Sequence, residues 1–260
     1  MPTILGEDQL RALAVPLREG ETYQDRDRID ELLAEHWKGK SAWSRDESEQ
    51  DRKQFTYGEV TPIGVRQLIH ILGLQQLVDD DKQSPMDPTV FYDLGSGAGK
   101  LVVQMFLEKV TSISVGVELS KRRHDLAVKS WTSLQEAAGL SRDDVVCKIR
   151  NKDGQLVEQD RVILLNKDMV KTDFSDATHI YLSSLCFPRA LADRAALRMM
   201  DNYQRHGKLK VILSLTDLKP FETDEMQALW TKSYELIHMT WGFSTVRVYK
   251  YKFASDHGKE

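Results

Sequence analysis

The chain has 260 residues, of which 41% are hydrophobic and 29% charged, and its formal net charge is −4. That length can bury one sizeable core, and the negative charge argues against a surface that binds polyanions over its whole area. Cys147 and Cys186 stand far apart in apolar contexts, which argues against a zinc site and a disulfide framework. Because a basic leader and long apolar runs are lacking, we expect an intracellular protein without membrane contact.

The first part of the chain is predicted to be helical. Apolar residues recur every three or four positions over Glu7–Val15 and Arg28–Trp37, a spacing typical of amphipathic helices. Charged residues dominate from Lys38 to Lys53, which indicates a loop. A further helix is predicted from Pro62 to about Val78, because a proline in the first turn of a helix loses no hydrogen bond.

From Val90 onward, strand-like apolar runs alternate with helix-like segments, which is typical of a parallel α/β sheet. The expected strands are Val90–Leu94, Ser112–Glu118, Val162–Asn166, His179–Leu182, Lys210–Leu215 and two closing strands near Glu235–Met239 and Val246–Phe253. The closing pair resembles a hairpin, so we expect the last strand to run antiparallel. A separate two-stranded ribbon is expected at Val145–Arg150 and Gln155–Val157, because Asp153-Gly154 is a strong turn signal.

The predicted fold is therefore α/β, with a seven-stranded, mostly parallel Rossmann-like sheet and helices on both of its faces. We assign this domain to residues 55–254. It follows an N-terminal helical extension over residues 1–54 and precedes a short tail over residues 255–260. The closing hairpin distinguishes this fold from a plain dinucleotide-binding domain.

A glycine-rich turn, Gly95-Ser96-Gly97-Ala98-Gly99, joins the first expected strand to a helix over Lys100–Lys109. Glycine leaves the backbone bare, so a ligand can approach it closely. A phosphate-binding P-loop is excluded because Leu94 stands where its first glycine belongs and Leu101 where its Ser or Thr belongs. The dinucleotide pattern Gly-x-Gly-x-x-Gly is excluded because Lys100 replaces its third glycine.

Acidic residues come at the ends of three successive strands. Asp93 lies beside the turn, Glu118 ends the next strand, and Asp168 follows the third. A carboxylate beside the turn suits a ligand with a sulfonium and an ammonium group, and it would repel a pyrophosphate. Glu118 can accept hydrogen bonds from both ribose hydroxyls, and Asp168 can accept one from an adenine amino group. This pattern predicts S-adenosyl-L-methionine as the cofactor of a methyltransferase. The other residues expected to contact it are Gly95, Ser96, Gly97, Gly99, Leu119 and Met169.

Three motifs resemble those of one known family. They are Asp93-Leu94-Gly95-Ser96-Gly97, Gly116-Val117-Glu118 and Tyr57-Gly58-Glu59. Together they resemble the non-SET histone lysine methyltransferases of the disruptor-of-telomeric-silencing family, which modify the globular core of histone H3, and the similarity covers about Phe55 to Phe253. The resemblance implies that Tyr57, Glu59 and Thr61 contact the methionine end of the cofactor. Packing of Tyr57 on the sheet is the alternative.

The resemblance also implies a channel for the substrate lysine after the fourth strand. The family carries Asn-Asn-Phe-x-Phe there, whereas this chain has Ser183-Ser184-Leu185-Cys186-Phe187. Phe187 still matches, and Tyr249 matches the family's spacing from Trp241, although Val248 replaces the first of its paired tyrosines. We expect Ser183, Ser184, Phe187 and Tyr249 to line the channel and orient the substrate, with Ser183 also near the cofactor. A core position in the strand is the alternative for Tyr249. A desolvated lysine beside a sulfonium needs no dedicated general base.

The resemblance implies a protein-lysine N-methyltransferase with histone H3 as its favoured target, in the nucleus. The alternatives are a diverged, cytoplasmic methyltransferase acting on another protein or a small molecule, and a regulatory module that binds cofactor without turnover. Ser183-Ser184 lacks the Asp/Asn-Pro-Pro pattern of enzymes that methylate nucleic-acid bases.

A nucleosome partner would need a basic face on the protein. The candidate residues are Arg189, Arg194, Arg198, Arg205, Lys208 and Lys210, opposed by Asp193 and Asp201. An ordinary solvated helix face explains the same pattern equally well. We expect direct contact with nucleic acid only through this face, and we expect no metal site.

Overall fold

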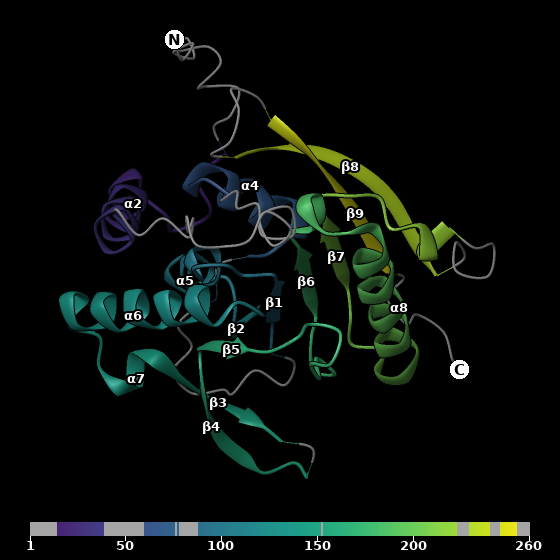
Figure 1. Cartoon of the computed structure of the whole chain (residues 1–260). Helices are drawn as coiled ribbons and strands as arrows, with labels where there is room; N and C mark the ends of the chain where they lie inside the picture. Colours follow the sequence, from purple (N-terminus) through teal and green to yellow (C-terminus); the bar gives the residue numbers. More distant parts are fainter. Residues whose placement is uncertain are drawn as a thin grey trace.

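Seven strands lie side by side in one sheet at the centre of the computed structural model (Figure 1). The structure describes residues 15–38, 60–75, 77, 88–151, 153–222, 229–239 and 245–253. The order of the strands across the sheet is β5-β2-β1-β6-β7-β9-β8. Their bounds are β1 Val90–Leu94, β2 Ile113–Glu118, β5 Val162–Asn166, β6 His179–Leu182, β7 Val211–Ser214, β8 Trp230–His238 and β9 Thr245–Phe253.

The first five strands of this sheet run parallel, and β9 runs antiparallel to both β7 and β8. This arrangement confirms the predicted α/β fold with a closing hairpin. The predicted strand bounds were correct at β1, β5 and β6, and β1 and β6 are buried at every position. The strand β8 begins at Trp230, well before the predicted Glu235. The sequence did not indicate this start because β8 is exposed from Thr231 to Leu236 and shows no burial alternation there.

The predicted ribbon is also confirmed. The strands β3 (Val146–Arg150) and β4 (Leu156–Asp160) pair antiparallel in a second small sheet. Their turn is closed by the side chain of Asn151, whose Oδ1 accepts hydrogen bonds from the backbone N–H groups of Asp153 and Gln155. Gly154 has a φ of 76°, a conformation that a residue with a Cβ rarely adopts.

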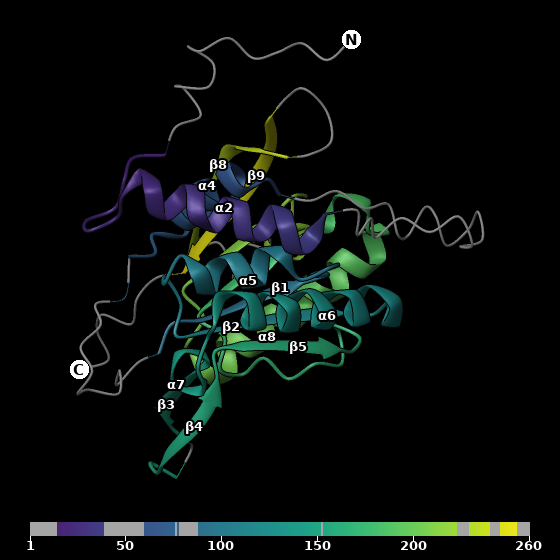
Figure 2. The same ribbon diagram turned by 90° about the vertical axis from the view of Figure 1, so that its left-hand side faces the viewer.

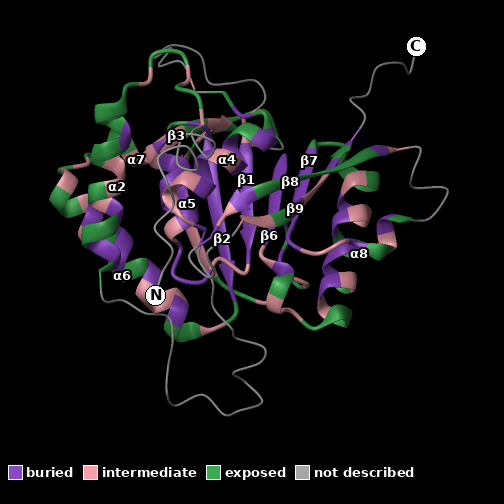
Figure 3. Cartoon of the chain, turned by 90° about the horizontal axis from the view of Figure 1, so that it is seen from above, coloured by how far each residue is buried: buried purple, intermediate pink, exposed green. Residues whose placement is uncertain are grey.

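Helices cover both faces of the main sheet. Side chains of α8 pack against one face, and side chains of α4, α5 and α6 pack against the other. The helix α2 lies outside α5 and α6 as a further layer (Figure 2). Buried residues are concentrated in the central strands and the inward sides of these helices (Figure 3). The bounds are α2 Tyr23–Trp37, α4 Pro62–Leu72, α5 Lys100–Leu107, α6 Lys121–Ala138, α7 Arg142–Val145 and α8 Arg189–His206, with 3-10 turns at Ser184–Cys186 and Lys219–Glu222.

Local capping explains where the predicted helix ends were wrong. The helix α2 starts at Tyr23, before the predicted Arg28, because Thr22 and Asp25 form a reciprocal capping box. The helix α4 stops at Leu72, before the predicted Val78, because Gly73 adopts the left-handed conformation that ends helices.

The helix α5 likewise ends at Leu107, two residues before the predicted end at Lys109. The predicted helix Glu7–Val15 and the predicted loop Lys38–Lys53 lie almost wholly outside the described residues. No helix in the described part of the chain is long and apolar enough to cross a membrane.

Candidate active site

The glycine turn connects β1 to α5 at the carboxyl edge of the sheet. Gly95, Gly97 and Gly99 have φ angles of 90°, 56° and 74°, so the backbone here takes a path that favours glycine. The backbone N–H groups of Gly95 and Ser96 donate to the carbonyl of Val117 at 2.8 and 3.1 Å, which ties the turn to β2. A Cβ on Gly99 would lie 2.9 Å from the Cβ of Ala127, so glycine also lets α6 approach the turn.

Glu118 ends β2 and holds the turn from that side. Its carboxylate accepts hydrogen bonds from the N–H of Gly97 and the N–H of Ser120, both at 2.8 Å, and the residue is 6% exposed. Each carboxylate oxygen can accept two hydrogen bonds, so one acceptor position remains on each. The geometry therefore lets Glu118 position the turn and still accept two hydroxyl groups of a ligand.

Asp93 is buried just before the turn, at the end of β1. It is 3% exposed, and its Oδ1 has no hydrogen-bond partner among the described residues. Burial, together with the nearby charge of Glu118, raises the pKa of Asp93 to about 8. A buried carboxylate without a partner is costly unless a cation or donor completes it. This environment fits the ammonium and sulfonium groups of the predicted cofactor.

Tyr181 is a neighbour of Asp93 that the sequence analysis did not single out. It is paired with Asp93 across β1 and β6 and is fully buried. Burial and the Asp93 carboxylate raise the pKa of its phenol. The sequence carried only a weak signal for this residue, because a tyrosine in an apolar strand is most often a core residue.

The end of β5 lies beside the end of β2. Asn166 donates from Nδ2 to the carbonyls of Glu118 and Leu119 at 2.9 and 3.0 Å, and so fixes the backbone after β2. Leu119 is 61% exposed, whereas Met169 is buried. Asp168 accepts a hydrogen bond from the N–H of Val170 at 2.9 Å, so it forms a local turn. The adenine contacts expected of Leu119, Asp168 and Met169 stay predictions.

Phe187 lies directly over the glycine turn. A Cβ added to Gly95 would be only 2.6 Å from Cζ of Phe187, so the aromatic ring occupies the space that a side chain would fill. Phe187 follows a 3-10 turn that begins at Ser184, and its N–H donates to the carbonyl of Ser184 at 3.0 Å. The structure thus brings together the predicted channel residue and the predicted cofactor turn.

Ser184 does not face a channel in this structure. It is 0% exposed, and its hydroxyl lies 2.9 Å from the hydroxyl of Ser214 and accepts from Thr216. The hydroxyl therefore joins the ends of β6 and β7, which corrects the expectation that it orients substrate. From the sequence alone, a serine buried in a hydrogen-bond network cannot be distinguished from a serine at a binding site. Ser183, next to it, is half-buried.

Tyr249 reaches the same edge from the antiparallel strand β9. It is paired with Ser214 on one side and with Tyr234 on the other. The residue is half-buried and packs against the main core, on the same face as Phe187. Its hydroxyl lies 3.5 Å from Nη1 of Arg247. Sheet pairing thus places Tyr249 beside the β6–β7 ends, which is consistent with a channel role but leaves that role a prediction.

A comparison with protein families identifies the chain. The family described as histone methylation protein DOT1 matches residues 50–234. The chain belongs to this family. It is an S-adenosylmethionine-dependent methyltransferase with a Rossmann-like fold, as the turn and the strand-end acids predicted, and S-adenosyl-L-methionine is its cofactor.

Solved structures resemble this DOT1-family chain at low identity. An RNA methyltransferase from Salinibacter ruber in complex with S-adenosyl-L-homocysteine is 15% identical, with 75% of this chain and 94% of that chain covered and a TM-score of 0.43. TrmK of M. capricolum, in complex with the same product, is 12% identical over 66% of each chain, with a TM-score of 0.40. The methyltransferase domain of bacterial CtHen1-CN is 12% identical, with 73% and 97% covered and a TM-score of 0.45. These likenesses carry no argument about the substrate. No curated protein matches the chain.

The Tyr57-Gly58-Glu59 loop, which resembles the DOT1 family, lies outside the described residues. Trp241 lies outside them as well. Thr61 is described, and its hydroxyl caps α4 by accepting from the N–H of Gly64 at 3.1 Å. The same hydroxyl lies 2.8 Å from Nδ1 of His238 in β8. Contact of Thr61 with the cofactor stays a prediction.

The predicted basic face on α8 is largely neutralised by internal ion pairs. Arg189 pairs with Asp193 at 2.9 Å, and Asp201 pairs with both Arg198 and Arg205 at 3.2 and 2.6 Å. Arg194, Lys208 and Lys210 have no ion pair within the described residues.

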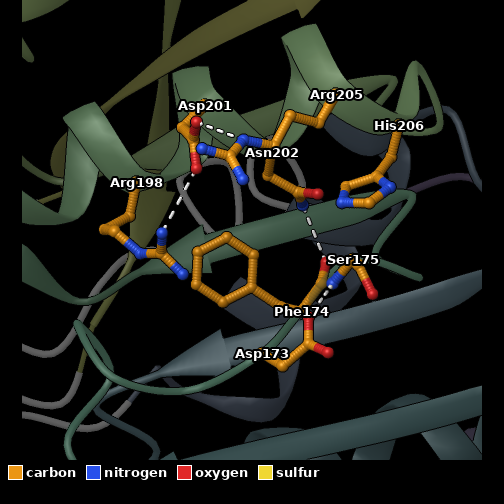
Figure 4. Close-up of a pocket in the computed structure, with 8 residues that line it drawn as sticks. All are labelled: Asp173, Phe174, Ser175, Arg198, Asp201, Asn202, Arg205 and His206. Carbon is orange, nitrogen blue, oxygen red and sulfur yellow. Dashed lines mark hydrogen bonds and ion pairs between the residues drawn. The ribbon is translucent and has the colours of Figure 1, made fainter.

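A pocket of about 160 Å³ lies beside the two ion pairs of Asp201 (Figure 4). It is formed by Asp173–Ser175, which precede β6, and by the end of α8, which precedes β7. It therefore lies at the amino edge of the sheet, opposite the glycine turn. The described residues contain no cluster of three or more His, Cys, Asp or Glu placed to hold a metal ion.

Proposed function

We propose that this chain is a protein-lysine N-methyltransferase whose target is a core lysine of histone H3. The observation that carries the proposal is the match to the DOT1 family of histone methylation proteins over residues 50–234. The contact between Phe187 and the glycine turn supports it, because an aromatic wall there suits the aliphatic stem of a lysine. A nuclear location follows from this proposal.

We infer the following roles for the residues that would hold the cofactor. S-adenosylmethionine, when bound, supplies an electrophilic methyl group. Glu118 has an acceptor position on each oxygen for the ribose hydroxyls. Asp93 has a buried carboxylate oxygen that no described residue pairs with, and this oxygen would face the cationic methionine end. Leu119 offers an exposed apolar side chain for an adenine face.

The acceptor amine needs to be positioned and neutral. Holding two reactants in line can supply roughly 7 to 11 kcal/mol of a barrier, so orientation accounts for much of the catalysis. Phe187 and Tyr249 exclude water from the approach to the turn, and Ser183 offers a hydroxyl at the same edge. Desolvation beside a cationic centre lowers the pKa of a lysine, so deprotonation needs no general base.

One observation favours a second candidate, methylation of another protein or of a small molecule by a diverged relative. Ser184 stands where the DOT1 family carries an asparagine. Its hydroxyl is buried between the ends of β6 and β7 and offers no group to a substrate. Loss of a polar contact in the pocket that binds the methyl acceptor alters the substrate specificity. It has a smaller effect on the type of reaction.

Transfer of a labelled methyl group tests these candidates. The chain would be incubated with nucleosomes, with free histones and with a cell lysate, and cofactor binding would be measured in parallel by calorimetry. Transfer to nucleosomes or histones supports the proposal. Loss of this transfer in Phe187→Ala would show that the reaction takes place at this site. Transfer only to another lysate protein or to a metabolite supports the second candidate. Cofactor binding without any transfer indicates a regulatory module.

We propose that a nucleosome would be contacted through three cations of α8 and the segment after it that form no ion pair with any described residue. These are Arg194, Lys208 and Lys210. Each phosphate contact steepens the dependence of affinity on salt. Replacing Arg194 by Glu should therefore weaken nucleosome binding and flatten its salt dependence, whereas cofactor affinity should not change. An unaltered salt dependence would remove this surface from the proposal.

A further inference from the structure

The last residue of α2 contacts the glycine turn directly. The indole N–H of Trp37 donates a hydrogen bond to the carbonyl of Ala98 at 2.9 Å, and both residues are buried. Ala98 lies between Gly97 and Gly99, both of which have positive φ angles. The N-terminal extension thus contributes one side chain to the turn over which the cofactor binds.

The turn is held from two sides. Glu118 accepts from the N–H of Gly97 on the β2 side, and Trp37 donates to the carbonyl of Ala98 on the α2 side. Within the turn, the N–H of Gly99 donates to the carbonyl of Ser96 at 2.9 Å. Because the glycines on both sides of Ala98 have little intrinsic backbone preference, the hydrogen bonds to Glu118 and from Trp37 help to fix the orientation of the turn from outside it.

The position of Trp37 is itself fixed by contacts from the middle and the end of α2. In the middle of the helix, Asp30 pairs with the buried Arg66 of α4 at 2.7 Å, and Arg66 also pairs with the buried Glu108 at 2.8 Å. At the end of the helix, Nδ1 of His36 lies 2.9 Å from the hydroxyl of Ser133 in α6. The indole ring also packs in a core cluster of α5 and α6 side chains. A side chain held this firmly can impose its geometry on a flexible turn.

We propose that Trp37 is a positioning residue of the cofactor site, and that α2 is part of the structure that binds S-adenosylmethionine. Without the indole N–H, the buried turn loses the hydrogen bond that ties it to α2. The glycine-rich backbone is then freer to leave the orientation that Glu118 also holds. The proposal concerns the cofactor alone and holds for any methyl acceptor.

Trp37→Phe tests the proposal because it removes the N–H and keeps an aromatic ring in the cluster. Its matched control is Trp131→Phe, because Trp131 is buried in the same cluster on α6. We expect Trp37→Phe to weaken calorimetric binding of S-adenosylhomocysteine about tenfold, the effect of one buried hydrogen bond. Trp131→Phe should lower the melting temperature without weakening binding. In turnover, Trp37→Phe should raise KM for the cofactor and leave kcat unchanged.

Hydrogen exchange in the wild-type protein provides a second test that does not depend on a variant folding. Coupling between two sites is reciprocal, so bound S-adenosylhomocysteine should slow exchange of the indole N–H of Trp37 and of the last amides of α2. Wild-type affinity in Trp37→Phe would overturn the proposal. Equal weakening in both tryptophan variants, or no change in exchange at α2 on binding, would overturn it as well.

Discussion

Replacing Asp93 by Asn should stabilise the cofactor-free protein and weaken cofactor binding. Burial and the charge of Glu118 raise the pKa of Asp93 to about 8, against 3.8 for the unperturbed group. Between these pH values the folded protein keeps a proton that the unfolded chain has released. The free energy of unfolding of the wild type therefore falls as the pH rises through this window, by about 1.4 kcal/mol per pH unit for this group.

The asparagine variant has no such dependence, so its advantage should grow with pH. The expected difference in unfolding free energy is close to zero near pH 4, about 4 kcal/mol near pH 7 and constant above about pH 8. Entry of water into the cofactor-free site lowers these values, because it reduces the desolvation of the carboxylate. The sign and the slope with pH follow from the burial of Asp93 alone.

Urea unfolding at about pH 5, 7 and 8.5 in the absence of cofactor measures this difference. Asp153→Asn, in the exposed β3–β4 turn, controls for the removal of one surface charge. A gap between wild type and Asp93→Asn that does not widen with pH would refute the reasoning.

Cofactor affinity should move in the opposite direction, because the variant loses a charge-assisted contact of roughly 1.5 to 3 kcal/mol. Binding of the cationic cofactor favours ionised Asp93, so near pH 7 it should release about one proton from the wild type and none from the variant. Calorimetry in buffers of different ionisation enthalpy measures that release. Cofactor affinity should accordingly fall in the wild type as the pH drops below about 8.

Three further substitutions test the site. Glu118→Ala should weaken cofactor binding by at least about tenfold in calorimetry, because it removes the tie to the turn and the two ribose hydrogen bonds proposed for this carboxylate; unchanged affinity would exclude the ribose role. Gly95→Ala should lower the melting temperature and cost about 1 to 2 kcal/mol, because its Cβ would lie 2.6 Å from Phe187 and its φ is 90°; wild-type stability would contradict the contact. Ser184→Ala should cost about 1 to 3 kcal/mol in urea unfolding, because it removes the hydroxyl that accepts from the N–H and the hydroxyl of Thr216, and should not alter cofactor affinity; loss of methyl transfer in a variant of unchanged stability would instead support a substrate role for Ser184.

The fold was largely predictable because the four central strands of the main sheet, β2, β1, β6 and β7, are buried runs. The strands β1 and β6 are buried at every position and lie between two strands of the sheet, so composition and length alone indicate them. The strand β8 was predicted too short, because its middle residues are exposed and its start depends on hydrogen bonds to β9. Pairing between strands is a property of the folded chain and leaves no mark in the sequence of an exposed strand.

Part of the site was predictable for a topological reason. Parallel strands end at the same edge of a sheet, so Asp93 and Glu118 were expected together and lie together, with the glycine turn between them. Their burial was not predictable, nor was the lack of a partner for Oδ1 of Asp93 among the described residues, because both depend on how the separate elements pack.

The fold class, the glycine turn and the acids at the strand ends can be read from the sequence, because periodicity and strand-end placement are local properties. What holds that turn depends on contacts between distant parts of the chain. Trp37 is 61 residues from Ala98 and Ser184 is 30 residues from Ser214, yet each pair is joined by a hydrogen bond. Such contacts arise when separate elements pack, so the residues on either side of them carry no pattern that reveals the partner.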